Sequence, residues 1–206
     1  YALALLSRLA ELRRRLVYCI LAFLAASVGA WEYREELLAF LVTPFEMAWR
    51  ENGIPGEPAL HFASPAAAFT AYFKLSLLGG AAVAAPVIFW QIWMFIAPGL
   101  YAKEKRYVIP FVASASILFV GGGYFGWRMA FPVAFKYLLG LSGNLETIGV
   151  EVKPTVMMDD YIDFVTRMLL GFGIIFLIPL FILFLSIAGI INYLHLIRYG
   201  RWFIVA

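Results

Sequence analysis

Two acidic residues stand among basic residues in this sequence, and this arrangement could bind a cationic ligand. Glu104 lies in the polar segment 99–106 with three basic residues, and Glu11 lies in segment 1–15 with four arginines. An arginine suits such a carboxylate, because its planar guanidinium can form two parallel hydrogen bonds with it. The alternative is a salt bridge of each acid with a basic neighbour on its own segment, which contributes only about 0–1 kcal/mol.

No comparable set of residues is suited to catalysis or to metal binding. The two histidines, His61 and His195, fall in different expected loops, and the single cysteine, Cys19, lies in an apolar run. The serines of the apolar runs have no histidine at membrane depth, and no cluster has the spacing of metal ligands. We therefore predict no catalytic residue, no metal and no cofactor. A net charge of +3 does not indicate nucleic-acid binding.

The composition places these acids in a membrane protein. Of the 206 residues, 64% are hydrophobic and only 14% are charged, and the mean hydropathy is +0.87. Soluble domains have roughly 45–50% apolar and about 25% charged residues. A chain of this size cannot bury several helices that are apolar on all sides. The fold class that follows is an all-α integral membrane protein.

The apolar runs divide the chain into a single polytopic membrane domain with four complete spans. A span of the roughly 30 Å hydrocarbon layer needs about 17–25 residues. The expected spans are 16–33, 73–98, 107–135 and 162–190, with the start of a fifth at 201–206. Insertions at 34–72 and 136–161 lie on one side, and segments 1–15, 99–106 and 191–200 lie on the other. An alternative for the first run is a cleavable signal peptide, because arginines, an apolar core and small residues follow one another there.

The charges predict which side faces the cytoplasm. Segments 1–15, 99–106 and 191–200, together with the adjacent Arg201, carry nine of the 16 basic residues and two of the 13 acids. The positive-inside rule puts this side in the cytoplasm. The two acids are therefore unusual for their side.

Prolines and glycines mark the expected bends and contacts of the helices. Pro44 predicts a kink in an amphipathic helix of the first insertion, Pro86 and Pro179 predict bends within spans, and Pro98 ends the second span. The glycines at 121–123 are either a flexible point or a close-packing face, and we favour packing.

Polar residues mark the expected helix starts. Ser64, which precedes a proline, predicts the N-cap of the second-span helix, and Asp159 or Asp160 predicts that of the fourth. Asp163 and Arg167 are four residues apart, so they are expected to pair on one helix face.

Two stretches resemble motifs of the TatC family, the core membrane component of twin-arginine protein translocation. Residues 8–16 resemble the opening H-L-x-E-L-R-x-R-L. Residues 85–106 resemble the family's first cytoplasmic loop signature, A-P-V-I-x-x-Q-x-W-x-F-I-x-P-x-L-Y-x-x-E followed by two basic residues. The similarity runs nearly end to end. It implies six transmembrane helices in a glove-like arrangement with both termini cytoplasmic, of which this sequence covers four and the start of the fifth.

The resemblance also implies a function and a site. The family is the receptor for signal peptides with two consecutive arginines, and it assembles with TatA and TatB to export folded proteins using the proton-motive force. A non-enzymatic, oligomeric complex among lipids of a bacterial, archaeal or plastid energy-coupled membrane is implied, with the N-terminus cytoplasmic. By position, the two acids would bind the arginines within a surface of five further residues. The implied site residues are Glu11, Phe95, Leu100, Tyr101, Lys103, Glu104 and Arg106.

The main alternative function is a small polytopic solute or ion transporter. That class usually has charged or broken helices at mid-membrane, often in internal repeats. The predicted spans lack charged residues at their centres and show no repeat, which favours the receptor.

Three departures from the family pattern stand out. Arg8 replaces the histidine of the first motif, Leu177 replaces a glutamate inside the fourth helix, and residues 1–7 do not resemble the family start. The first departure adds a cation beside Glu11, and the second removes an acid from the concave face.

Overall fold

The computed structural model describes residues 2–54, 56–96, 108–143 and 155–187. Within these ranges four helices are long and apolar enough to cross a membrane, as the sequence predicted. The expected start of a fifth span lies outside the described residues. In chain order the elements are α1 (Ala2–Glu32), α2 (Arg34–Glu51), β1 (Leu60–His61), α3 (Pro65–Ile96), α4 (Val108–Phe125), η3 (Gly126–Ala130), α5 (Phe131–Gly143), β2 (Val156–Met157) and α6 (Met158–Ile187).

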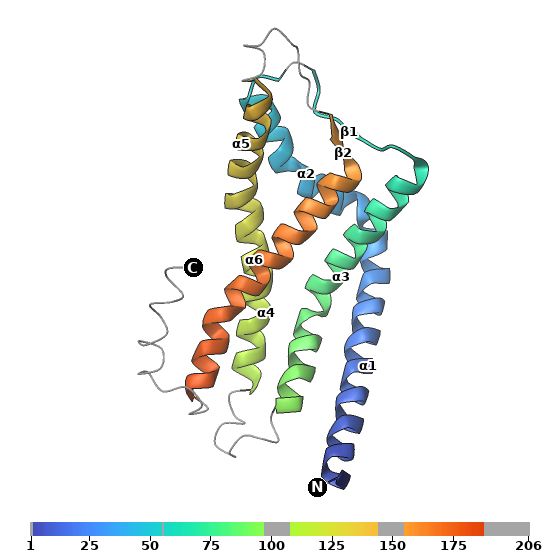
Figure 1. The fold of residues 1–206 in the computed structure, drawn as a ribbon, viewed down its shortest axis with the longest axis vertical. Helices are drawn as coiled ribbons and strands as arrows, with labels where there is room; N and C mark the ends of the chain where they lie inside the picture. Colours follow the sequence, from blue (N-terminus) through green and yellow to red (C-terminus); the bar gives the residue numbers. More distant parts are fainter. Residues whose placement is uncertain (1, 55, 97–107, 144–154, 188–206) are drawn as a thin grey trace.

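The long helices run along one axis, with the small elements gathered at one end (Figure 1). Helix α1 lies beside α3 along its length, and α6 crosses obliquely, packing on α3 and α4. Helix α4, the π-helical turn η3 and α5 continue one another as a single rod. We call the end that carries α2, β1 and β2 the cap end. There β1 and β2 pair in parallel, Leu60 with Val156 and His61 with Met157.

The main core lies at the cap end, where aromatic rings pack among aliphatic residues. Phe45 of α2 packs against Tyr161 of α6 and Phe135 of α5, with ring centroids 5.6 and 6.0 Å apart. Phe131, Ile162 and the ring of Phe45 are at most 1% exposed. Tilted and edge-on rings of this kind contribute about 0.5–1.5 kcal/mol per pair beyond their buried area. This core fixes α2 across α5 and α6.

Pro44 leaves the Phe40 carbonyl of α2 without its usual donor, and side chains of other elements bond two carbonyls of this turn. A proline has no N–H for the carbonyl four residues earlier, here Phe40, and its ring disturbs the preceding turn. The indole Nε1 of Trp127 in η3 donates to the Phe40 carbonyl at 3.0 Å, and the Tyr161 hydroxyl donates to the Leu41 carbonyl at 2.7 Å. The predicted kink residue therefore joins α2 to η3 and α6.

Helices α1 and α3 approach so closely that only glycine fits at the crossing. A Cβ on Gly80 would lie 2.1 Å from Oγ and 2.7 Å from Cα of Ser27. A Cβ on Gly79 would lie 3.1 Å from both Ala30 and Leu37. The Ser27 hydroxyl is satisfied within α1, because it donates to the Phe23 carbonyl at 2.8 Å. Small residues here allow the close packing expected of membrane helices.

The glycines at 121–123 confirm the packing interpretation at one position. A Cβ on Gly122 would lie 2.8 Å from the Phe172 carbonyl oxygen and 2.9 Å from Phe176, both on α6. A Cβ on Gly121 would meet nothing within 4 Å. Of the predicted bends, Pro86 and Pro179 lie inside helices, in α3 and α6 respectively.

One expected helix start is confirmed and the other is wrong. Helix α3 begins at Pro65, and the Ser64 hydroxyl accepts a hydrogen bond from the Ala67 amide at 3.1 Å. Helix α6 begins at Met158, directly after β2, so Asp159 and Asp160 lie in its first turn and neither is the N-cap. Asp159 instead accepts a hydrogen bond from the hydroxyl of Thr70 in α3, at 3.2 Å.

Asp163 connects α6 to α3 as well as to its own helix. Its Oδ1 lies 2.6 Å from Nζ of Lys74, and its Oδ2 lies 3.9 Å from Nη2 of Arg167. The expected pair with Arg167 is therefore present, but the shorter bridge goes to α3. Sequence reasoning did not anticipate Lys74.

The α1–α3 crossing predicts a sharp difference between two glycine variants. Gly80→Ala should lower the free energy of unfolding by about 1–3 kcal/mol, because the Ser27 backbone must shift to admit the methyl group. Gly29→Ala is the matched control on α1, since a Cβ there meets nothing within 4 Å. Unfolding of the purified protein in mixed detergent micelles measures both. Equal effects would contradict the close crossing.

The hydrogen bond from Trp127 to the Phe40 carbonyl predicts that substitutions at residues 44 and 127 have non-additive effects on the free energy of unfolding. Trp127→Phe should lower the free energy of unfolding by about 1 kcal/mol, because the Phe40 carbonyl loses its donor. In a Pro44→Ala background the loss should shrink, since the new amide of residue 44 can bond that carbonyl. A double-mutant cycle in the same unfolding assay measures the coupling. An identical loss in both backgrounds would refute it.

Candidate functional site

Glu11 lies on an unbroken helix rather than on a separate arm. Helix α1 runs from Ala2 to Glu32, so the predicted N-terminal segment and the first span are one rod. Glu11 sits at the end of the molecule opposite the cap end, near the N-terminus marked in Figure 1. A rigid helix therefore fixes the position of its carboxylate relative to the spans.

The carboxylate of Glu11 is held by Arg15, one helical turn further on. Both Nη2 and Nε of Arg15 donate to Oε1 of Glu11, at 2.6 and 3.1 Å. The side chains are 27% exposed for Glu11 and 14% exposed for Arg15. The salt bridge that the sequence offered as the alternative for Glu11 is thus present in the structure.

Arg15 also connects this pair to α3. Its Nη1 donates to Oε1 of Gln91 at 3.4 Å, across 76 residues of sequence. Gln91 was not singled out from the sequence, although it is a polar residue within the long apolar run of α3. That isolation was the available signal for it. The three side chains form a polar group between α1 and α3, which we call the Glu11 cluster.

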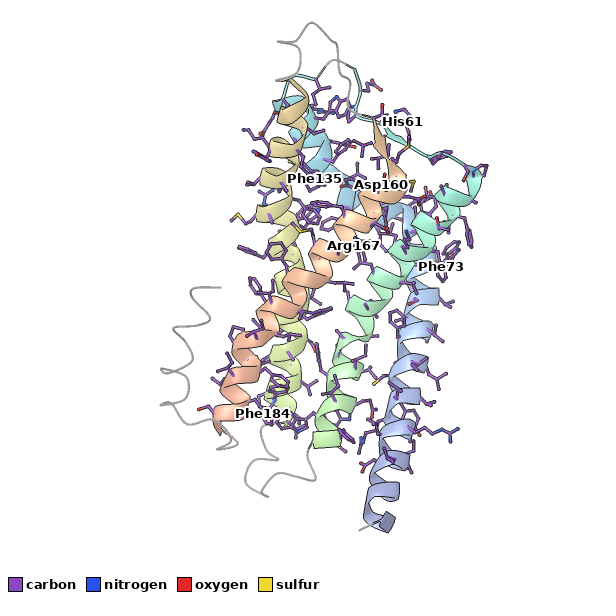
Figure 2. All side chains as sticks on the ribbon, viewed as in Figure 1. His61, Phe73, Phe135, Asp160, Arg167 and Phe184 are labelled. Atoms are coloured by element: carbon purple, nitrogen blue, oxygen red, sulfur yellow. The ribbon has the colours of Figure 1, made fainter. Side chains whose placement is uncertain are left out.

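The last turns of α3 are positioned by an aromatic group that packs against α4 and α6. Trp93 is 1% exposed and lies 4.6 Å, between ring centroids, from both Phe111 of α4 and Phe184 of α6. Figure 2 labels Phe184 at this end of the molecule. Phe95, a predicted site residue two positions further on, is half-buried. These contacts fix the helix end from which segment 99–106 continues.

The remaining predicted site residues cannot be placed on this framework. They lie outside the described residues and are Leu100, Tyr101, Lys103, Glu104 and Arg106, together with Pro98 as a structural residue. Of the predicted set, the structure thus places Glu11 and Phe95, on neighbouring helices at one end of the molecule. Their role as binding residues stays a prediction.

An apolar recess opens between the helices closer to the cap end. It has a volume of about 280 Å³ and receives side chains from α2, α3, α4, η3 and α6, among them Leu78, Phe119, Trp127 and Leu170. Leu177, the residue at the position of the family glutamate, follows Leu170 by seven residues, so it lies on nearly the same face of α6. This side of α6 is therefore apolar where the motif expects an acid. Among the described residues, no group of three or more His, Cys, Asp or Glu could hold a metal ion.

Four apolar spans and a polar cluster at one helix end define a multi-pass α-helical membrane protein. Comparison with known proteins identifies it further. Residues 7–206 match the model of the family described as Sec-independent protein translocase protein (TatC). The chain belongs to the TatC family, whose members are components of a protein translocase and not catalytic enzymes.

Individual relatives agree with this assignment. A Sec-independent protein translocase protein TatC of Koribacter versatilis is 35% identical over 191 residues, covering 92% of this chain and 67% of the relative. That of Desulforapulum autotrophicum is 38% identical over 184 residues, covering 89% of this chain and 64% of the relative. The chain thus spans about two thirds of the length of these two relatives.

Solved structures share the fold as well. A crystal structure of the twin arginine translocase receptor TatC superimposes with a TM-score of 0.80 at 34% identity, covering 96% of this chain and 82% of that one. A second crystal structure of this receptor, in DDM, gives a TM-score of 0.81 at 34% identity and covers 84% of its chain.

The geometry of the Glu11 cluster predicts that the acid is not needed for folding. Glu11→Gln should lower the free energy of unfolding by less than about 1 kcal/mol, because the pair is partly exposed and the close α1–α3 crossing lies elsewhere, at Gly80. Unfolding in mixed micelles measures this effect, with Gly80→Ala as the destabilised reference. A loss as large as that of Gly80→Ala would mean that the cluster holds α1 and α3 together.

Proposed function

We propose that this protein is the receptor component of a twin-arginine translocase, and that it binds signal peptides bearing two consecutive arginines. The observation that carries the proposal is its likeness, over 96% of the chain, to a crystal structure described as the twin arginine translocase receptor. The Glu11 cluster at one end of the helices supports the proposal, because a half-buried acid is suited to recognise a guanidinium.

The peptide arginine is proposed to bind Glu11 through the attraction between its guanidinium and the carboxylate. Arg15 contacts a single oxygen of Glu11 and holds the carboxylate in one orientation. A carboxylate can accept about four hydrogen bonds, so a guanidinium of the peptide can compete for this acid with the partners that it already has. Arg15 already donates to Gln91 on α3, so it keeps a hydrogen-bond partner if the peptide displaces it from Glu11. The salt bridge between Glu11 and Arg15 thus orients the carboxylate, and it is compatible with peptide binding at Glu11.

The second arginine is assigned to Glu104. This residue follows α3 by eight positions, and α3 ends on the same end of the molecule as Glu11. The end of α3 is anchored by the buried Trp93 group, which limits where the following segment can begin. Phe95, Leu100, Tyr101, Lys103 and Arg106 are proposed to form the surface around the two arginines.

The rest of the proposal concerns the whole translocase. The Glu11 end faces the cytoplasm by the distribution of basic residues, and the cap end faces the opposite side. In this proposal the protein assembles with TatA and TatB into an oligomeric complex of an energy-coupled membrane. The complex exports folded proteins and is driven by the proton-motive force.

Loss of the acids should weaken peptide binding without removing the protein from the membrane. Glu11→Gln and Glu104→Gln should each reduce the affinity for an Arg-Arg signal peptide by about tenfold to a hundredfold, because each removes a charge-assisted hydrogen bond of about 1.5–3 kcal/mol. Photo-crosslinking of a labelled peptide to membranes measures this affinity. Glu35→Gln is the matched control, since its side chain is 74% exposed on α2 at the cap end.

The peptide itself supplies the complementary test. A Lys-Lys peptide should bind more weakly than the Arg-Arg peptide, since an ammonium group cannot make the planar two-bond contact. Undiminished crosslinking in the double variant Glu11→Gln/Glu104→Gln would reject this assignment of the site. Equal binding of both peptides would mean that only net charge is recognised.

A further inference from the structure

In α6 a charge-free run begins directly after Arg167, so the boundary of the hydrocarbon layer nearest the cap end is inferred to lie at this residue. The 20 residues from 168 to 187 carry no charge, which at 1.5 Å per residue is roughly the 30 Å thickness of that layer. On α3, residues 75–96 are also free of charge, so Lys74 lies at the same boundary. Phosphate groups of the lipid headgroups occupy this depth of a bilayer.

The guanidinium of Arg167 is exposed, and its N–H groups can reach a ligand outside the protein. Lys74 neutralises Asp163 through the 2.6 Å bridge, and Arg167 is left 3.9 Å from the other oxygen, beyond hydrogen-bond distance. The Arg167 side chain is 83% exposed, against 39% for each of its two neighbours. Arginine offers five N–H donors in a planar fork that fits a phosphate.

Below Arg167 the same face of α6 is apolar, and one of its positions is a glycine without a side chain. Gly171, Ile174 and Ile178 follow at intervals of four, three and four residues, which places them on one helix face. The two isoleucines are 58% and 49% exposed, and a Cβ on Gly171 would meet nothing within 4 Å. A hydrocarbon chain can therefore lie along this face directly beneath the cation.

Above Arg167 the face carries an acid. Asp160 precedes it by seven residues, and both are labelled on the cap-end half of α6 in Figure 2. They share a recess of about 370 Å³ with Asp163, Phe164 and Met168. From water to membrane, the surface thus presents an acid, then a guanidinium, then an apolar helix face. A lipid with an outward amine, a phosphate and an acyl chain has the complementary order.

We propose that this recess binds a zwitterionic phospholipid of the leaflet nearest the cap end, with a phosphoethanolamine headgroup. Its phosphate accepts hydrogen bonds from Arg167, and its primary ammonium donates to Asp160. One acyl chain lies over Gly171 between Ile174 and Ile178. A quaternary ammonium has no N–H to donate, and a glycerol headgroup has no cation, so the primary amine confers the preference.

Native mass spectrometry of the purified chain tests the site, with phosphatidylethanolamine, phosphatidylcholine and phosphatidylglycerol of identical acyl chains added in turn. The unmodified protein should retain phosphatidylethanolamine in preference to the other two. Arg167→Gln should reduce this retention roughly tenfold, and Asp160→Asn should remove the preference over phosphatidylcholine. Gly171→Leu puts a side chain where the acyl chain is proposed to lie, without altering a charge, and it should also reduce retention. Arg128→Gln, at an exposed cation of η3, is the matched control and should change nothing.

Three results would overturn the proposal. One is equal retention of the three lipids by the unmodified protein. Another is retention by Arg167→Gln and Gly171→Leu that equals that of Arg128→Gln. The third is a change in oligomeric state with Arg167→Gln at unchanged lipid retention, because it would assign this face to a protein partner. Circular dichroism of each variant confirms that the helices are intact before lipid is added.

Discussion

The cap end of the molecule depends on two hydrogen bonds that join the Pro44 turn of α2 to η3 and α6. Pro44 has no N–H to donate to the Phe40 carbonyl, and backbone carbonyls at this turn accept hydrogen bonds from donors on other elements. Trp127 and Tyr161 supply them, and in doing so they fix η3 and α6 against α2. The aromatic core then closes around these contacts.

Local patterns of the sequence were sufficient for the features that neighbouring residues determine. The four spans and the Ser64 N-cap each follow from composition or short-range chemistry. What the sequence could not supply was the partner across the fold. Lys74, which forms the shorter bridge to Asp163, is 89 residues away, and no helical spacing relates the two positions.

The candidate site shows the same division between local and distant contacts. The i, i+4 spacing of Glu11 and Arg15 made their pairing a foreseeable alternative, whereas Gln91 becomes part of the cluster only because α1 and α3 pack side by side. The expected N-cap at Asp159 or Asp160 failed for a related reason. Strand β2 runs directly into α6, and its pairing with β1 decides where the helix begins.

The parallel pairing of β1 with β2 has a consequence for the order in which the protein assembles. Leu60 pairs with Val156, and the Leu41 carbonyl accepts a hydrogen bond from the Tyr161 hydroxyl, 120 residues further along the chain. Contacts of such sequence separation carry a large loop-closure cost and form late. The α1–α3 hairpin can pack as soon as its two helices are made. The cap end stays open during synthesis until the fourth span emerges, and its closure completes this part of the fold.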